Sequence, residues 1–587
     1  MDIATTAPLD DHGRLLHDDD PAAQIALATA RLEAALADVD RSVHDLATVR
    51  VLTTDPVAAA TVLDVVTDRL AELGSAAVVE LVEVPVLGRP GQVVALEPLL
   101  RPVGPAVDRL LPTPPSRETP IRTTHEGHEM TSTTLPAPAD TLRDLCGGAV
   151  HLPGDPGYDP ARTPWNVAVD LRPAAVAHPR TTQDVVEVVR AARAAGLRVA
   201  PQSTGHGAGT LAGADLSDVV LVKLNELTGV TVDAESRTAR VVGGTLWQDV
   251  VAEAAPHGLT ALHGSAGDVA VAGYALSGGL SFYGRQHGLA TSSIRAVELV
   301  TAAGELVRAD AEQHADLFWA VRGGGGSFGI VVAIEIALLP IADVVAGMLL
   351  WDRERAPEVV RAWAQWTREV PDSVTTSLRV MSFPPLPELP PFLSGRQLVV
   401  VDGAVLEDDE RAAELLAPLR ALSPEMDTFA RIPAAALLQV HMDPPAPTPS
   451  VAEHCVIGEI GDDTIEALLA EVGPGTLSPL MFAELRHLGG ALSRPAEGAG
   501  AVSHLPGEYA VLALAVASTP EMASDGLAAA QRLVAAIAPW SVPGRVLTFT
   551  ERPDDSSTGY PAGARERLTA LREAYDPEDA LVAAHRP

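Results

Sequence analysis

The chain has 587 residues, 47% of them hydrophobic and 20% charged, which is the composition of a globular protein with roughly two to four domains. Its 42 basic and 77 acidic residues give a formal net charge of −35, which argues against nucleic acid and anionic membranes as partners. The two cysteines, Cys146 and Cys455, exclude a disulfide framework and a cysteine-based zinc site, and we expect no metal.

The amino-terminal residues show no targeting signal, because residues 1–6 carry neither a basic stretch nor an apolar run after it. No run of about 18 apolar residues predicts a transmembrane helix. We therefore expect a cytoplasmic location.

The first segment, residues 1–112, has the pattern of a small α/β domain. Apolar spacing predicts helices over 24–37 and 58–73, and β-branched runs predict strands over 49–54, 77–86 and 93–96. Residues 113–141 are rich in Pro, Thr and Ser and poor in apolar side chains, which is typical of a flexible linker.

The next segment, residues 142–344, contains the most informative stretch of the chain, residues 201–210. This stretch holds three glycines, three hydroxyl side chains and His206. Glycine allows close approach of the backbone and positive φ, so such a loop can direct several N–H groups at a phosphate. A second small-residue region, 264–288, contains seven glycines, and a third glycine run lies at 323–329.

Periodicity around these loops predicts alternating helices and strands. The expected helices are 182–195, 246–255 and one ending at 317–321, and the expected strands are 197–200, 219–224, 238–242, 296–301 and 330–338.

The third segment, residues 345–545, alternates strands with helices. Its expected strands are 348–351, 375–381, 398–402, 480–488 and 509–516, and its expected helices are 356–369, 408–421 and 520–538. This pattern predicts an α+β layer with a mostly antiparallel sheet. The last segment, 546–587, contains an expected helix over 564–575.

Five motifs occur in an order and spacing that resemble the FAD-binding domain of the vanillyl-alcohol oxidase superfamily, nearest to its berberine-bridge-enzyme branch. They are TGHGAG at 204–209, LWQDV at 246–250, GLTALHG at 258–264, VAVAGYALSGG at 269–279 and DLFWAVRGGGGSFG at 316–329. The resemblance implies an α+β fold with a two-part FAD-binding domain over 142–344, an antiparallel-sheet substrate domain over 345–545, and a carboxyl-terminal segment over 546–587 that returns to the FAD-binding domain.

The resemblance also implies which residues contact FAD. These are Gln202, Ser203, Thr204, Gly205, His206, Gly207, Gly264, Ser265, Ala266, Val269, Gly273, Ser277, Gly278, Gly329, Ile330 and Val331. His206 matches a histidine that is often bonded covalently to the flavin; the alternative is a histidine that only hydrogen-bonds the cofactor. Ala266 stands where some relatives attach flavin through cysteine, so any attachment here is single. Ser327 and Thr548 stand where asparagine is common.

Residues acting on a substrate are expected on the strand over 480–488. Glu484 and Arg486 share one face of this strand, while His487 points to the other. In a dry cleft a carboxylate would have a raised pKa and could accept a proton. The alternative is a solvated outer face with an Arg–Glu pair. Tyr274 is a third candidate.

Three further residues are weaker candidates for a role in catalysis. Tyr283 and His263 lie in or beside the second glycine-rich region. His441 begins a proline-rich segment that we expect to be a loop over the mouth of the cleft.

The front of the chain, about residues 5–98, resembles a truncated member of the reactive-intermediate deaminase (Rid) family, whose members hydrolyse imines. The opening strands of that fold are not evident, and no arginine lies between Arg69 and Arg89 to bind a substrate carboxylate. The resemblance therefore implies a degenerate Rid-like domain with a role in assembly or docking.

Together these features predict an FAD-dependent oxidoreductase that takes a hydride from a small-molecule alcohol, amine or related C–H donor. Electrons would pass to oxygen or another acceptor. One alternative is a catalytically inactive flavin-fold scaffold, and another is an imine hydrolase acting through the amino-terminal domain.

Overall fold

The computed structural model describes residues 46–53, 78–83, 94–100, 138–385, 390–444, 446–552 and 558–586. The chain divides into two compact units, Met1–Met130 and Thr131–Pro587. The helices expected over 24–37 and 58–73, and the expected linker as far as residue 137, lie outside the described residues.

The described part of the first unit is a three-stranded sheet. Strand β1 (Leu46–Thr53) lies at its centre, parallel to β2 (Val78–Glu83) and antiparallel to β3 (Val94–Leu100). Each of these strands overlaps one that β-branched composition predicts. The resemblance to the Rid family stays a prediction, because most residues that carry it lie outside the described part of the chain.

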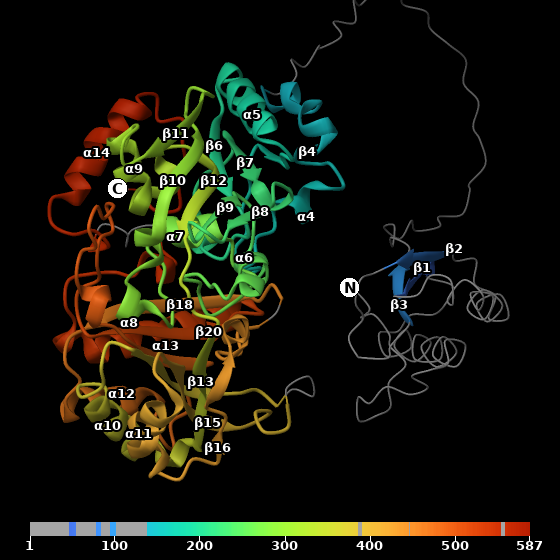
Figure 1. Ribbon diagram of the computed structural model, residues 1–587. Helices are drawn as coiled ribbons and strands as arrows, with labels where there is room; N and C mark the ends of the chain where they lie inside the picture. Colours follow the sequence, from blue (N-terminus) through green and yellow to red (C-terminus); the bar gives the residue numbers. More distant parts are fainter. Residues whose placement is uncertain are drawn as a thin grey trace, which may run out of the picture. The chain divides into compact units, whose positions relative to one another are not determined.

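The second unit contains two small sheets in its first half (Figure 1). The four-stranded sheet has the order β4 (Val150–His151), β5 (Ala175–Ala177), β7 (Val219–Lys223), β6 (Arg198–Gln202). The five-stranded sheet has the order β11 (Leu306–Asp310), β10 (Ile294–Val300), β12 (Ile330–Ala337), β9 (Thr238–Val242), β8 (Val230–Asp233). The α-helices of this half are α4 (Tyr158–Arg162), α5 (Thr182–Ala194), α6 (Trp247–Ala254), α7 (Val271–Leu276), α8 (Gly284–His287) and α9 (Ala315–Gly324).

Apolar side chains from both sheets form one core between them. Val220 and Val222 of β7 share this core with Ile330 and Val332 of β12, and all four are buried. The helix α5 packs its valine stripe into the same core. It begins where Thr181 and Asp184 form a capping box, with each side chain accepting a hydrogen bond from the backbone of the other.

The second half of the unit is an eight-stranded sheet in which all neighbours are antiparallel, as the sequence predicts. Its strands are β13 (Asp343–Asp352), β14 (Val374–Ser382), β15 (Gln397–Val405), β16 (Met426–Asp427), β17 (Ala430–Pro433), β18 (Ser450–Ile457), β19 (Phe482–His487) and β20 (Tyr509–Val516). Its helices are α10 (Ala356–Trp366), α11 (Asp409–Arg420), α12 (Asp462–Val472) and α13 (Pro520–Ile537).

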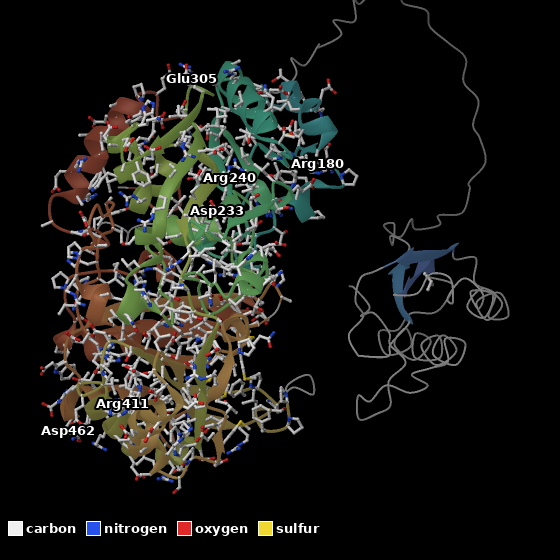
Figure 2. All side chains as sticks on the ribbon, in the orientation of Figure 1. Arg180, Asp233, Arg240, Glu305, Arg411 and Asp462 are labelled. Atoms are coloured by element: carbon white, nitrogen blue, oxygen red, sulfur yellow. The ribbon has the colours of Figure 1, made fainter. Side chains whose placement is uncertain are left out.

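The two faces of this large sheet differ in character. Leu378, Val401 and Leu485 point to the face that the four helices cover, where Trp351, Trp363 and Trp366 are buried. Because successive residues of a strand point to opposite faces, their neighbours Arg379, Asp402 and Glu484 or Arg486 point to the other. These charged side chains are buried. By contrast, the charged side chains labelled in Figure 2 (Arg180, Asp233, Arg240, Glu305, Arg411 and Asp462) are exposed.

The carboxyl-terminal segment runs back to the first half of the unit. Helix α14 (Ala564–Tyr575) packs against α9, beside which it lies in Figure 1. The backbone of Val199 in β6 bonds to that of Ala580 and Val582, at 2.8 Å each. In the part of the chain that the structure describes, no helix is long and apolar enough to cross a membrane.

Candidate cofactor and substrate site

One cavity is lined by residues from six separate stretches of the second unit, and we call it the cofactor cavity. It encloses about 1160 Å³ of space not filled by protein atoms, part of it open to solvent. Its lining residues are Pro201, Gln202, Ser203, Thr204, Gly205, His206, Gly207, Ala208, Leu211, Leu224, Val269, Ala270, Ala272, Gly273, Tyr274, Leu276, Ser277, Gly323, Gly324, Gly325, Gly326, Gly329, Val331, Leu547, Thr548, Ala584 and His585. The loops around 203–207 and 269–277, predicted to act together, therefore line one space.

Glycines shape this cavity by backbone conformation and by lack of side chains. Gly205 has φ +87°, and a Cβ there would lie 2.6 Å from the Cβ of Pro164, so this position requires glycine. At Gly207 and Gly273, in contrast, an added Cβ would meet no protein atom within 4 Å. A ligand can therefore come close to the backbone at these two positions.

Four polar atoms of cavity-lining residues have unused hydrogen-bonding capacity. Among the described residues, Gln202 Oε1, His206 Nε2, Thr548 Oγ1 and His585 Nδ1 are buried without a hydrogen-bond partner. Buried polar atoms are nearly always paired in folded proteins, so these atoms point to a polar ligand. The glycine-lined walls and these atoms suit a dinucleotide with a flat ring system.

His206 is held on three sides. Its ring stacks on Trp165 with centroids 4.1 Å apart and planes inclined by 19°. Its Nδ1 lies 2.8 Å from the Thr204 hydroxyl, and its Nε2 lies 3.7 Å from Oδ1 of Asp268. Burial lowers the pKa of His206 to about 4, although the charges of Asp268 and Asp443 oppose this shift. The ring is therefore neutral near pH 7.

Most of the residues predicted to contact FAD line this cavity. They are Gln202, Ser203, Thr204, Gly205, His206, Gly207, Val269, Gly273, Ser277, Gly329 and Val331. Gly264, Ser265, Ala266, Gly278 and Ile330 stand outside the lining set. The side chain of Ile330 is 0% exposed and lies in the core between the two sheets, because alternation along β12 turns Val331 to the cavity and the Ile330 side chain away, so any contact of Ile330 with FAD would be through its backbone.

The other residues outside the lining set have different neighbours. Gly264 makes room for an aromatic ring, since a Cβ there would lie 3.0 Å from the ring of Tyr274. Ser265 hydrogen-bonds the carboxylate of Asp443. His263 and Tyr283 pack edge to face in the core at 5.6 Å and are both fully buried, so neither lines the cavity.

Glu484 and Arg486 form a buried ion pair on the face of the large sheet that the four helices do not cover. Arg486 donates from Nη2 and Nε to Oε1 of Glu484 at 2.8 and 3.0 Å. Glu484 is 1% exposed, so the alternative of a solvated outer face is wrong. Burial alone would lower the pKa of Arg486, but the charge of Glu484 raises it above its ordinary value.

Aromatic rings surround this pair, and His487 has separate partners. The Arg486 guanidinium lies between the rings of Phe282 and Phe549, at 5.9 and 5.3 Å from their centroids. His487 faces the opposite way and contacts Arg285 at 2.8 Å, as alternation along the strand predicts.

His441 completes a network that the sequence did not reveal. Its Nδ1 lies 2.9 Å from Oδ2 of Asp402, and its Nε2 lies 3.6 Å from Oε1 of Glu484. Residues 441–444 form neither helix nor strand, as expected of a loop, but the side chain of His441 is 2% exposed and points into the interior. A buried carboxylate needs charged partners, and the segment after β17 brings this histidine inward to supply one.

Asp402 is the centre of that network. Its carboxylate also contacts Arg379 and accepts a hydrogen bond of 2.6 Å from the Ser377 hydroxyl. Burial alone would raise the pKa of Asp402, but Arg379 and His441 hold it well below its usual range. We call Arg379, Asp402, His441, Asp443, Glu484 and Arg486 the charged cluster.

Tyr274 lies where the cofactor cavity and the charged cluster meet. It lines the cavity, and its hydroxyl donates to the carbonyl of Leu280. Burial raises its pKa, and the charges of Arg486, Asp443 and Glu484 act on the same hydroxyl. Of the three predicted catalytic residues, Tyr274 therefore faces the cavity directly, while Glu484 and Arg486 stand behind it in the cluster.

Comparison with known proteins identifies the cofactor of this domain. Residues 173–310 match the family model described as "FAD binding domain". Over 205 residues the chain is 34% identical to (R)-6-hydroxynicotine oxidase of Paenarthrobacter nicotinovorans, covering 35% of this chain and 44% of that protein. Over 222 residues it is 30% identical to glucooligosaccharide oxidase of Sarocladium strictum, covering 37% and 44%. These matches span just under half the length of either relative.

Solved structures show the same fold over a longer stretch. The model matches 6-hydroxy-D-nicotine oxidase of Arthrobacter nicotinovorans with a TM-score of 0.65 and 24% identity, over 73% of this chain and 95% of that one. It matches the Physcomitrella patens berberine-bridge-enzyme-like protein 1 with a TM-score of 0.66 and 21% identity, over 77% and 99%. The second unit thus has the α+β fold of these proteins. The match of residues 173–310 to the FAD-binding family shows that its cofactor is FAD.

Proposed function

We propose that this chain is an FAD-dependent oxidoreductase that takes a hydride from a small-molecule alcohol or amine. The observation that carries the proposal is the junction at Tyr274, where the glycine-lined cavity of the FAD-binding domain meets the buried charged cluster of the antiparallel sheet. The oxidases among the relatives act on hydroxynicotine and on oligosaccharides by name, which supports an alcohol or amine donor.

The cavity residues would hold the cofactor mainly through the backbone. Around 203–207, N–H groups next to glycine would bind the pyrophosphate without basic side chains, which suits an acidic protein. The small residues at 269–277 would let the ring system lie close to the chain. Bound there, FAD supplies the hydride acceptor.

The charged cluster would orient the donor and accept its proton. Arg486 and Glu484 would hold the hydroxyl or amine of the substrate. Asp402 would hold the proton of His441 on Nδ1, so that the lone pair of Nε2 accepts a hydrogen bond of 3.4 Å from Nη2 of Arg486, with Oε1 of Glu484 3.6 Å away. Once Arg486 turns to the substrate, His441 Nε2 would accept the proton that the donor loses as its hydride leaves, which is general base catalysis.

Spectroscopy of the purified full chain tests the proposal. We expect a yellow protein whose visible flavin absorbance disappears when an alcohol, amine or oligosaccharide from a substrate panel is added without oxygen, and returns when air is admitted. A colourless protein that takes up no added FAD would contradict the proposal, as would bound flavin that no member of the panel reduces.

A further inference from the structure

We infer that Asp268, held in place by Trp165, removes a proton from His206 and thereby allows the histidine to bond covalently to the ring methyl group of FAD. The inference rests on the proposed function only in that FAD must occupy the cofactor cavity. Neither Asp268 nor Trp165 is among the residues predicted to contact FAD, and neither belongs to the charged cluster.

The two oxygens of the Asp268 carboxylate have different partners. Oδ2 accepts a hydrogen bond of 2.6 Å from Nε1 of Trp165, and Oδ1 lies 3.7 Å from Nε2 of His206. The first bond fixes the carboxylate plane and leaves the second oxygen directed at the imidazole. A carboxylate in this position orients a histidine and accepts or balances its positive charge.

The contacts of His206 assign its tautomer. The Thr204 hydroxyl, 2.8 Å from Nδ1, can donate to that nitrogen when its lone pair is free. Among the described residues, Nε2 is buried without a hydrogen-bond partner, and Asp268 is the acceptor in front of it. We therefore place the proton on Nε2, facing Asp268, which leaves on Nδ1 a lone pair that can attack a carbon atom once the Thr204 hydroxyl releases it.

Trp165 also holds the imidazole ring itself. Its indole stacks on the ring of His206 with centroids 4.1 Å apart, which fixes the plane of the imidazole. The backbone N–H of Trp165 donates to the carbonyl of Thr204 at 2.9 Å, so the tryptophan and the histidine loop are tied together. Lys223 anchors the same segment through a 2.8 Å hydrogen bond from Nζ to the carbonyl of Thr163.

The attachment step balances with dioxygen as the oxidant. A C–N bond forms between Nδ1 of His206 and the methyl carbon, while one C–H bond of the methyl group and the Nε2–H bond of the imidazole break. Asp268 would receive the proton from Nε2 and release it to solvent, and the methyl group would likewise lose one proton, while the electron pair of its C–H bond is left with the cofactor. Dioxygen would take that electron pair together with two protons, to give hydrogen peroxide and the attached cofactor in its oxidised form.

The test follows the rate of attachment after FAD is added to flavin-free full chain. Acid-precipitated protein is examined for retained flavin fluorescence, and intact mass gives the attached fraction with time. We expect Asp268→Asn to attach FAD about 10²-fold more slowly than the natural chain, the effect of losing a positioned base. Total bound FAD, attached and acid-releasable together, should reach the same level in both.

Matched variants separate this role from general damage. His206→Ala gives the background signal of a chain that cannot attach FAD. Asp233→Asn makes the same change of side chain at an exposed position outside the cavity lining, and it should attach FAD at the natural rate. Trp165→Phe keeps a ring over His206 but removes the hydrogen bond to Asp268, so it should also be slowed. If Asp268→Asn does not fold, Trp165→Phe and Asp268→Glu carry the test, the latter retaining attachment.

Two results would overturn the inference while leaving the proposed function intact. One is attachment by Asp268→Asn at the natural rate, and the other is a natural chain whose FAD is entirely released by acid yet is still reduced by a substrate. A chain that takes up no FAD at all contradicts the proposed function instead.

Discussion

The cofactor cavity and the charged cluster are neighbours built in opposite ways. The cavity wall is mostly backbone and small side chains, including the glycines at 205, 207 and 323–326. The cluster is made of long charged side chains from β14, β15, β19 and the segment around His441. A wall of backbone suits a cofactor shared by many proteins, whereas side chains from separate strands determine which donor reacts.

The two regions also differ in what they contribute to stability. The glycine-lined wall of the cavity contributes little to the free energy of folding, because it leaves space for a ligand and buries few side chains. The cluster buries at least two carboxylates and two guanidinium groups that are tolerable only together, because removing one partner leaves a buried charge uncompensated. Substitutions in the cavity should therefore affect FAD binding, and those in the cluster should affect reduction or folding.

The largest expected effect tests the separation directly. His441→Asn keeps a donor toward Asp402 but removes Nε2, so the rate of flavin reduction by a substrate should fall about 10²–10⁴-fold, while FAD content stays unchanged. Stopped-flow reduction and the flavin-to-protein ratio give both quantities. His257→Asn, an exposed change, is the control. Loss of FAD from His441→Asn would show that the two regions are not separate.

The second prediction concerns folding of the cluster. Asp402→Ala leaves Arg379 and His441 buried without their carboxylate, which should lower the free energy of unfolding by about 3–5 kcal/mol. Denaturant titration of the flavin-free chain measures this. Ser377→Ala, which removes one 2.6 Å hydrogen bond to Asp402 and no charge, should cost about 1–3 kcal/mol. Equal costs for both variants would contradict the ionic interpretation.

The third prediction concerns the cavity wall, where a substitution should weaken FAD binding without lowering the stability of the flavin-free chain. In α7, Gly273→Ala adds a methyl group that meets no protein atom within 4 Å, so the flavin-free chain should be as stable as before or slightly more so. The methyl group enters the space assigned to FAD, and affinity should fall about 10-fold. Gly461→Ala has similar free space and ordinary φ but lies at the start of α12, so its FAD affinity should not change.

The same contrast explains which parts were readable from the sequence. The cavity loops are short, contiguous and rich in glycine, so their composition alone indicates close approach of backbone to a ligand. Alternation placed Glu484 and Arg486 on one face of β19. A motif does not say which residue of a strand faces inward, and only the structure shows that the side chain of Ile330 points into the core while that of Val331 faces the cavity.

The charged cluster was less accessible to sequence reasoning. Asp402 and His441 are brought together by pairing of distant strands and by a proline-rich segment, and only the pairing shows that they meet. A signal was present: Asp402 interrupts the apolar strand over 397–405, and a charge in a buried strand requires a partner. Nothing in the local pattern names that partner. The same is true of Trp165 and Asp268, whose contact spans 103 positions.

The smallest expected effect asks whether the cavity side of the molecule carries its own pH dependence. Burial raises the pKa of Glu551 to about 7 from an ordinary 4.5, although the amide of Asn166, 3.4 Å from Oε2, opposes this. A carboxyl whose pKa is raised by folding favours the folded state below 4.5 and loses that contribution as pH rises through about 7. Glu551→Gln should therefore match the natural chain at low pH and melt a few degrees higher at pH 8.

The position of Glu551 makes this a test of the cavity and not of the chain at large. A Cβ added at Gly209, in the loop that carries His206, would lie 2.7 Å from the carbonyl oxygen of Glu551, so the two segments are packed together. Melting curves of the flavin-free chain between pH 5 and pH 8 measure the effect, with Glu305→Gln as an exposed control. If the melting temperatures of Glu551→Gln and the natural chain differ by the same amount at every pH in this range, Glu551 is not the group that titrates. A gap that opens with pH would show that even the backbone-built region depends on the protonation of one buried side chain.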